Sequence, residues 1–138
     1  MPLMFLNGGA MRGGPLHYLL GDAPLVREAR TAGRYRFYSV DDRFPALDEV
    51  ESGGVQVSGE LYDLTWTLLR DFLLPSEPTE LELGIIELED GTGSLAMIRR
   101  RVYTEPATLV DISGYGNWRD YIDYRGEPGE PSEPGEGS

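Results

Sequence analysis

The first chemical signal in this sequence is a glycine-rich segment that follows a short apolar run near the N-terminus. Without Cβ atoms in the way, successive main-chain N–H groups can face a ligand and form an anion-binding nest. Such a nest would suit a carboxylate or an oxyanion, although an ordinary tight turn is the alternative. It is not a phosphate loop, because no Gly-Lys-Ser/Thr follows it. The candidate binding residues are Asn7, Gly8, Gly9, Ala10 and Met11.

An acidic stretch over residues 76–82, with the sequence SEPTELE, is the second candidate. It joins a predicted helix to a predicted strand, and a carboxyl group at such a junction can be half buried. Burial would raise the pKa of that carboxyl group and suit it to proton transfer near neutral pH. The alternative is a solvated loop in an acidic protein.

The remaining candidates are the only histidine, His17, and a set of aromatic residues. His17 lies beside Leu16 and Tyr18, so it is either a base or a half-buried helix residue. Aromatic residues usually belong to the core, but one or two tyrosines can line a pocket and present hydroxyl groups to a polar ligand. We take Tyr38 and Tyr115 as candidates for that role.

The composition excludes several kinds of chemistry. There is no cysteine, which rules out disulfides, a thiol nucleophile and cysteine-bound metals. All 12 cationic residues are arginine, so no lysine can form a Schiff base. A single histidine cannot build a multi-histidine zinc site, and no G-x-S-x-G motif accompanies it. We therefore expect no metal and no cofactor.

The charge and hydropathy limit the partners. A net charge of -12 and a pI near 4.4 argue against nucleic acid, because phosphate binding needs a basic surface. No apolar run approaches the roughly 20 residues of a membrane span, so we expect no membrane partner. The first residues also lack the basic start of a signal peptide, which predicts a cytoplasmic protein.

The elements that must position the candidate residues are mostly strands, because short apolar or alternating runs dominate. Thr65 is a suitable N-cap for the best helix. That helix would place Trp66, Leu69 and Leu73 on one face. We predict strands over residues 3–6, 25–31, 35–40, 55–64, 81–88 and 94–103, a main helix over 65–74, a short helix over 15–20, irregular chain over 44–47 and 51–54, and a turn with a short helix over 111–121.

This pattern predicts an α+β fold with a curved sheet or small barrel. The length fits one domain, which we place at residues 1–125. Residues 126–138 read GEPGEPSEPGEGS and contain no apolar side chain. Such a segment cannot bury enough surface to offset its ordering entropy, so we predict a disordered acidic tail.

The order of segments resembles the γ-glutamylcyclotransferase-like superfamily. Residues 5–13 (FLNGGAMRG) are similar to its first strand and loop, and residues 55–64 (VQVSGELYDL) to its VxGELY-type strand. Residues 83–91 (LGIIELEDG) and 111–121 (DISGYGNWRDY) narrow the match, because they resemble the C-terminal domain of allophanate hydrolase. The resemblance implies a small mixed, mainly antiparallel β-barrel-like sheet with one main helix and one open cavity.

The resemblance also implies a site. In cyclotransferases, the loop after the first strand binds the substrate carboxylate through main-chain N–H groups, and a glutamate after the helix acts as general acid/base. By position, the loop here is residues 7–11, and the glutamate is Glu77, with Glu82 as the alternative. In allophanate hydrolase, this domain acts on the carboxylated product of an amidase domain and assists its decarboxylation.

Two readings of the function remain open, because the sequence departs from both family patterns. Asn7 replaces the tyrosine of the cyclotransferase loop, and Ala10 replaces the histidine of the allophanate hydrolase loop. The first reading is an enzyme for a small carboxylate-bearing amide or carbamate. The second is a non-catalytic ligand-binding or accessory domain for an amidase-type enzyme. The expected partners are such a ligand, with a second copy of the chain or an amidase-type protein.

Overall fold

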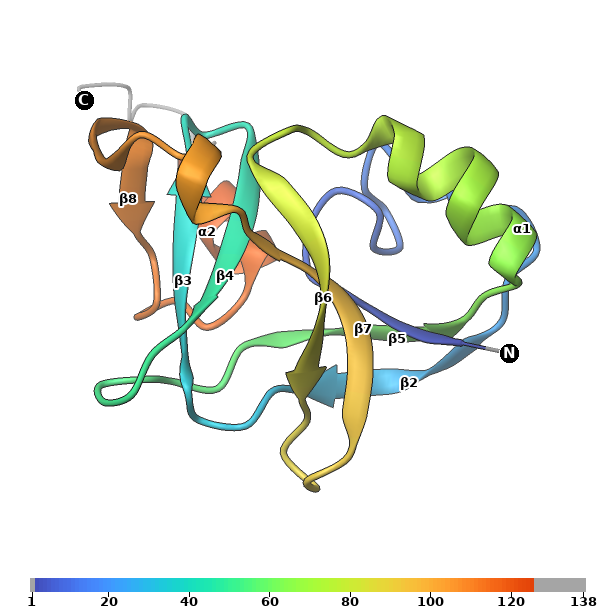
Figure 1. Ribbon diagram of the computed structural model, residues 1–138, viewed down its shortest axis with the longest axis horizontal. Helices are drawn as coiled ribbons and strands as arrows, with labels where there is room; N and C mark the ends of the chain where they lie inside the picture. Colours follow the sequence, from blue (N-terminus) through green and yellow to red (C-terminus); the bar gives the residue numbers. More distant parts are fainter. Residues whose placement is uncertain (1, 126–138) are drawn as a thin grey trace.

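One mixed sheet of eight strands forms the body of the molecule in the computed structural model, which describes residues 2–125 (Figure 1). The predicted tail over residues 126–138 lies outside the described residues. Five strand pairs are antiparallel and two, β1–β7 and β4–β7, are parallel. The strands are β1 (Leu3–Leu6), β2 (Leu25–Arg30), β3 (Tyr35–Val40), β4 (Phe44–Glu49), β5 (Ser58–Asp63), β6 (Leu81–Glu87), β7 (Gly93–Arg99) and β8 (Leu109–Asp111).

The sheet is strongly curled, with the order β2-β5-β1-β7-β4-β3-β8 and with β6 paired to β7. In Figure 1, β2 and β5 run across the view, whereas β3 and β4 run up it. Strand β7 pairs with two strands in succession along one edge, since Ala96 pairs with Phe5 of β1 and Ile98 pairs with Leu47 of β4. Met97 lies between these two pairs. The predicted barrel-like, mainly antiparallel sheet is therefore confirmed.

The main helix begins as α1 (Trp66–Leu68) and continues through a wider turn, η2 (Leu69–Leu73), and a tight turn, η3 (Leu74–Ser76). Thr65 caps it as predicted, since its hydroxyl accepts a hydrogen bond from the Leu68 N–H at 3.0 Å. Leu69 and Leu73 are buried, as expected. Trp66 is not on the buried face, because 66% of it is exposed.

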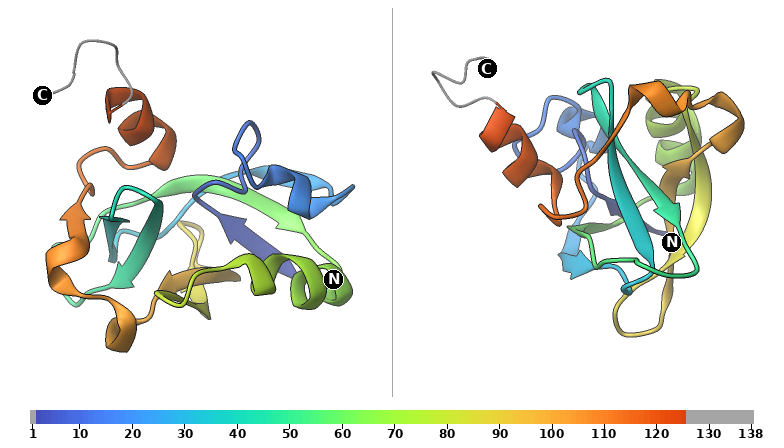
Figure 2. Two further views of the ribbon diagram at one scale, coloured as in Figure 1. Left: turned by 90° about the horizontal axis from the view of Figure 1, so that it is seen from above. Right: turned by 90° about the vertical axis from the view of Figure 1, so that its left-hand side faces the viewer.

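A second helix, α2 (Trp118–Arg125), closes the described chain and buries Trp118 and Tyr121. Figure 2 shows α1 and α2 on opposite sides of the molecule, with the loop that follows β1 on the same side as α2. A 3-10 turn, η1 (His17–Leu20), replaces the short helix predicted over residues 15–20. None of the helices in residues 2–125 is long and apolar enough to cross a membrane.

Several predicted element boundaries were wrong, among them that of the short helix predicted within residues 111–121, which is α2 at Trp118–Arg125. Residues 44–47 belong to β4, which was missed because Pro45 disfavours a strand and because Pro45 to Asp48 are all buried, so no alternation appears. Residues 55–57 precede β5, and only Val55 makes an isolated bridge, to Tyr35. The last part of the predicted strand over 94–103 is a 3-10 turn, η4 (Arg101–Tyr103). Another short 3-10 turn, η5 (Pro106–Thr108), leads into β8.

Candidate functional site

A cavity of about 290 Å³ opens where β1 and β4 separate along β7. Its walls come from the end of β1, the loop that follows β1, the start of β4 and the η3–β6 connection. Because β7 pairs with β1 up to Ala96 and with β4 at Ile98, Met97 faces the point of separation. The cavity is lined by Phe5, Leu6, Asn7, Gly8, Gly9, Ala10, Leu16, Arg43, Phe44, Pro45, Ser76, Glu77, Pro78, Leu81 and Met97.

The loop over residues 7–14, which we call the opening loop, is fixed by its own main chain. Met11 N–H donates to Gly8 O at 3.1 Å, and Leu16 N–H donates to Gly9 O at 2.9 Å. Gly14 must be glycine, because a Cβ there would lie 2.2 Å from Gly9 O. Within residues 2–125, the N–H groups of Gly9 and Ala10 donate to no protein acceptor, and both residues line the cavity. The described chain therefore leaves both of these main-chain donors unused.

His17 supports this loop from behind. Its Nδ1 lies 3.0 Å from Ala10 O. A carbonyl oxygen can only accept, so Nδ1 carries the proton in this contact. The imidazole also lies against the ring of Tyr62, with 5.9 Å between ring centroids. His17 does not line the cavity, so its contacts position the loop rather than reach a ligand there.

Glu77 lines the same cavity as the opening loop. It follows η3 in an extended conformation, and its N–H donates to Leu74 O at 3.1 Å. Burial raises the pKa of the Glu77 carboxyl group to about 7, and no charged or hydrogen-bonding partner among residues 2–125 opposes this effect. Asn7, which lines the same cavity, provides a second polar group without a partner. Its Nδ2 is buried and makes no hydrogen bond with the described residues.

The structure separates the other predicted site residues from this cavity. Glu82 lines a different hollow, beside Arg100, whose Nε lies 3.8 Å from a Glu82 carboxylate oxygen. Tyr115 is a surface residue that packs against Tyr121 and Tyr124, at centroid distances of 5.3 and 5.7 Å. Tyr38 is on β3 and is not among the lining residues. Met11 is buried and faces the opposite side of the opening loop.

The profile of the allophanate hydrolase C-terminal domain family matches residues 2–123 of this sequence. The chain belongs to this family. Among solved structures, the uropathogenic Escherichia coli-specific protein c4763 is 34% identical, with a TM-score of 0.81, and the match covers 89% of this chain and 96% of that one. No match to a curated protein was found.

Longer relatives contain a similar domain. The allophanate hydrolase of Kluyveromyces lactis is 28% identical, with a TM-score of 0.80, over 88% of this chain but only 21% of that protein. An AIG2-like protein from Mus musculus is 21% identical, with a TM-score of 0.60, over 78% of this chain and 82% of that one, and it shares the fold. The γ-glutamylcyclotransferase-like fold is thus shown.

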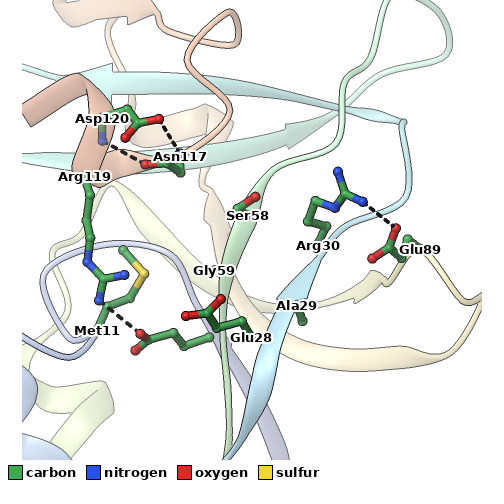
Figure 3. A pocket seen from close by; sticks show the side chains of 11 residues that line it. Met11, Glu28, Ala29, Arg30, Ser58, Gly59, Glu89, Asn117, Arg119 and Asp120 are labelled. Carbon is green, nitrogen blue, oxygen red and sulfur yellow. Dashed lines mark hydrogen bonds and ion pairs between the residues drawn. The ribbon is translucent and has the colours of Figure 1, made fainter. Parts of the chain in front are cut away.

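This allophanate hydrolase C-terminal-like domain has a second pocket, of about 490 Å³, between β2, β5 and α2 (Figure 3). Sequence reasoning missed its central residue, Glu60, which is 1% exposed. Its carboxylate accepts hydrogen bonds from the Arg12 N–H at 2.8 Å, Arg12 Nε at 2.9 Å, Arg119 at 3.0 Å and the Tyr62 hydroxyl at 2.9 Å. The pocket is lined by Met11, Glu28, Ala29, Arg30, Ser58, Gly59, Glu60, Glu89, Asn117, Arg119 and Asp120.

The hydrogen bonds around Glu60 decide its protonation. Burial by itself would raise the pKa of Glu60, but the donors of Arg12, Arg119 and Tyr62 outweigh it and lower the pKa to about 2. Burial and, after it, the hydrogen bond to the Glu60 carboxylate raise the pKa of Tyr62 to about 12, although the two arginines act in the opposite direction. Glu60 is a permanently charged anchor for the far end of the opening loop, and it has no donor capacity for proton transfer.

Sequence reasoning also missed Arg43, a cation in the wall of the Glu77 cavity. Its position depends on the β3–β4 hairpin, which was not predicted. One local signal was available, since Asp41 and Asp42 form an acidic pair directly after an aromatic strand, and Asp is favoured in turns.

Proposed function

We propose that this domain is an enzyme that acts on a small carboxylate-bearing amide or carbamate in the Glu77 cavity. The observation that carries the proposal is that the opening loop and Glu77 line one and the same cavity. The loop offers unpaired main-chain donors, and Glu77 offers a carboxyl group that can exchange a proton. In this proposal, Glu82 has no catalytic part, because it lies in another hollow.

The pKa of Glu77 supports proton transfer at neutral pH. Catalysis by a general acid/base is most efficient when its pKa lies near the working pH. With a pKa of about 7, both forms of Glu77 are present in comparable amounts there. The carboxylate takes a proton from the attacking group, and the resulting acid returns it to the departing nitrogen.

The chemistry proposed for the cavity needs only placement and one proton carrier. Intramolecular attack of an amine on an amide carbonyl is accelerated chiefly by holding the two groups at the correct distance and angle. The Gly9 and Ala10 N–H groups would hold a carboxylate or the developing oxyanion. A cavity of about 290 Å³ is at the lower end for ligand sites and fits a ligand of this size.

The relatives suggest a setting for this reaction. The allophanate hydrolase and the urea amidolyase of K. lactis include a similar domain as 21% and 8% of their chains. We propose that an amidase-type protein supplies the ligand in an analogous way. A second copy of this chain remains the alternative partner.

The test is turnover of γ-glutamyl amines and of small carbamates by the wild-type protein and by Glu77→Gln. We expect the substitution to reduce kcat by about 100-fold or more, because it removes the proton carrier. Wild-type kcat should titrate with an apparent pKa near 7. Glu82→Gln is the matched control, with the same change of charge in another hollow, and it should retain the wild-type rate.

Two results would contradict the enzyme proposal. An unchanged rate for Glu77→Gln would remove Glu77 from the mechanism. Measurable binding of these compounds without turnover would support the accessory, non-catalytic reading instead.

A further inference from the structure

Arg43 is the only cationic side chain among the described residues that line the Glu77 cavity. Its guanidinium donates to a carboxylate oxygen of Glu80 at 3.1 Å and lies 4.9 Å from the centroid of the Phe44 ring. A guanidinium has five N–H donors, and the Glu80 contact is the only side-chain hydrogen bond that Arg43 makes within residues 2–125. Arg43 therefore has capacity to bind a further anion.

The turn that carries Arg43 has an unusual backbone. Asp41 and Asp42 both have positive φ angles, of 55° and 57°, which residues other than glycine rarely adopt. The turn is closed by Arg43 N–H, which donates to Val40 O at 3.0 Å. Strained conformations persist only where the surrounding structure holds them, and they concentrate at functional sites.

Contacts from three other residues hold this turn in place. The carboxylate of Asp42 accepts hydrogen bonds from the Ser39 hydroxyl at 2.9 Å and from the Tyr121 hydroxyl at 2.6 Å. Arg125 lies 3.7 Å from the same carboxylate. Burial would raise the pKa of Asp42, but these donors outweigh it and lower that pKa. Helix α2 thus fixes the turn from which Arg43 projects.

The register of β4 is also fixed beside the cavity. Pro45, two residues after Arg43, packs so closely on Gly8 that a Cβ there would lie 2.9 Å from Pro45 Cδ. Any side chain at position 8 would push β4 away from the opening loop. The hairpin and the opening loop are therefore packed against each other, and both contribute residues to the cavity wall.

We infer that Arg43 selects the ligand by binding a carboxylate at the mouth of the Glu77 cavity, and that the Asp41–Asp42 turn is the device that holds it there. The inference rests on the proposed function, because it concerns the same cavity. It adds the requirement that the ligand carry a negative charge. Glu77 and Glu80 both lie close to the site, and the chain carries a net charge of -12. An anionic ligand would be repelled without a compensating cation.

Glu80 has a defined part in this arrangement, because it competes with the ligand for Arg43. An arginine can bind one carboxylate with two parallel hydrogen bonds, and it now spends one donor on Glu80. Removing the Glu80 charge should free the Arg43 donor that now binds Glu80, and it should make the site less negative. Arg43 and Glu80 substitutions are therefore expected to change anion binding in opposite directions.

The test uses two probes that differ in one group, succinamate and its neutral analogue succinamide, titrated by NMR or calorimetry. We expect wild type to bind succinamate about tenfold more tightly than succinamide, as for one charge-assisted hydrogen-bonded pair. Arg43→Gln should abolish this preference and Arg43→Lys should keep part of it. Glu80→Gln should increase it. Arg70→Gln makes the same charge change in η2, where Arg70 pairs with Asp71, and should leave the preference intact.

The role of the Asp41–Asp42 turn is tested with Tyr121→Phe, which removes one of the hydrogen bonds to Asp42. This change should weaken the preference for succinamate by a few-fold and leave the affinity for succinamide unchanged. Equal affinity of wild type for both probes, or a preference that survives Arg43→Gln, would overturn the inference, as would an equal loss in Arg70→Gln. These outcomes do not depend on turnover. If charge selection holds and no compound is turned over, the catalytic proposal fails and the role of Arg43 stands.

Discussion

Two glutamates in this domain have opposite protonation behaviour although both are largely removed from water. Glu60 accepts four hydrogen bonds, two of them from Arg12, and its pKa is lowered to about 2. Glu77 has no such partner among the described residues, and burial raises its pKa to about 7. The difference lies in the donors around each carboxyl group, since burial acts on both in the same direction.

The two sites are connected by the opening loop. Residues 7–10 of the loop line the Glu77 cavity, whereas the Arg12 N–H near its other end donates to Glu60. Arg119 of α2 donates both to Glu60 and to Arg12 O, at 3.0 and 2.5 Å. Glu60 thus anchors the loop that lines the cavity of Glu77. Glu60, whose carboxylate accepts four hydrogen bonds, stabilises the fold. Glu77, which has no such donors around it, can bind and release a proton near neutral pH.

The largest expected effect comes from Glu60→Gln. This change removes the charge that Arg12 and Arg119 share and leaves an amide in a site built from donors. We expect a loss of about 3 kcal/mol in the free energy of unfolding at pH 7, measured by urea denaturation. The control is Glu28→Gln, since Glu28 also pairs with Arg12, at 3.0 Å, but is 74% exposed, and it should cost about 0.5 kcal/mol or less.

The pH dependence gives the sign of this contribution. The pKa of Glu60 is lower in the folded protein, about 2, than its ordinary value of 4.5. The stabilisation is therefore complete above about pH 4.5 and is lost as the pH falls toward 2. If wild type and Glu60→Gln kept the same stability difference down to pH 2, the ion-pair account of this site would be wrong.

The second largest effect is that of Glu77→Gln, which should stabilise the fold at high pH, whereas Glu60→Gln destabilises it. Because the pKa of Glu77 is raised to about 7, its contribution to stability is full below pH 4.5 and is lost as the pH rises through 7. Ionised Glu77 then destabilises the fold. Glu77→Gln should therefore raise the free energy of unfolding at pH 8 by about 2 kcal/mol, while it removes activity.

Two measurements check this assignment. The stability gain of Glu77→Gln should shrink between pH 8 and pH 5 and nearly vanish at pH 4.5. Glu82→Gln, at a carboxyl group that is 46% exposed, should show no comparable trend. A loss of stability in Glu77→Gln at pH 8 would mean that the ionised carboxylate has a partner in solution.

Much of the fold could be predicted from local sequence. The apolar run of β1 and the aromatic alternation of β3 gave strands with the observed bounds, because each pattern is set by neighbours in the chain. The main helix followed from the Thr65 cap and the Leu69–Leu73 spacing. β4 could not be found this way, since its burial on both faces and its Pro45 remove the usual signals.

Some residues of the candidate site could also be predicted from the sequence, and others could not. The family resemblance predicted one site formed by the opening loop and Glu77, and both line one cavity. Glu60 carried no local signal, because its partners Arg12 and Arg119 are 48 and 59 residues away in the chain. Tyr38 and Tyr115 were chosen by residue type, which does not say whether a tyrosine faces the cavity.

The smallest effect isolates one donor of the Glu60 site. Tyr62→Phe removes the hydroxyl that donates to Glu60 at 2.9 Å and leaves both arginines in place. We expect a loss of about 1.5 kcal/mol in the free energy of unfolding, the lower end for a single hydrogen bond to a charged acceptor. The pKa of Glu60, followed by NMR of its carboxyl carbon, should rise above its wild-type value of about 2 but stay below 4.5.

Tyr18→Phe is the matched control, because Tyr18 is 74% exposed and its hydroxyl makes no hydrogen bond within residues 2–125. It should leave both stability and the Glu60 pKa unchanged. If Tyr62→Phe left the Glu60 pKa at its wild-type value, the two arginines alone would account for the lowered pKa. The contrast with Glu77 would then depend on nearby positive charge, and the number of donors would be irrelevant.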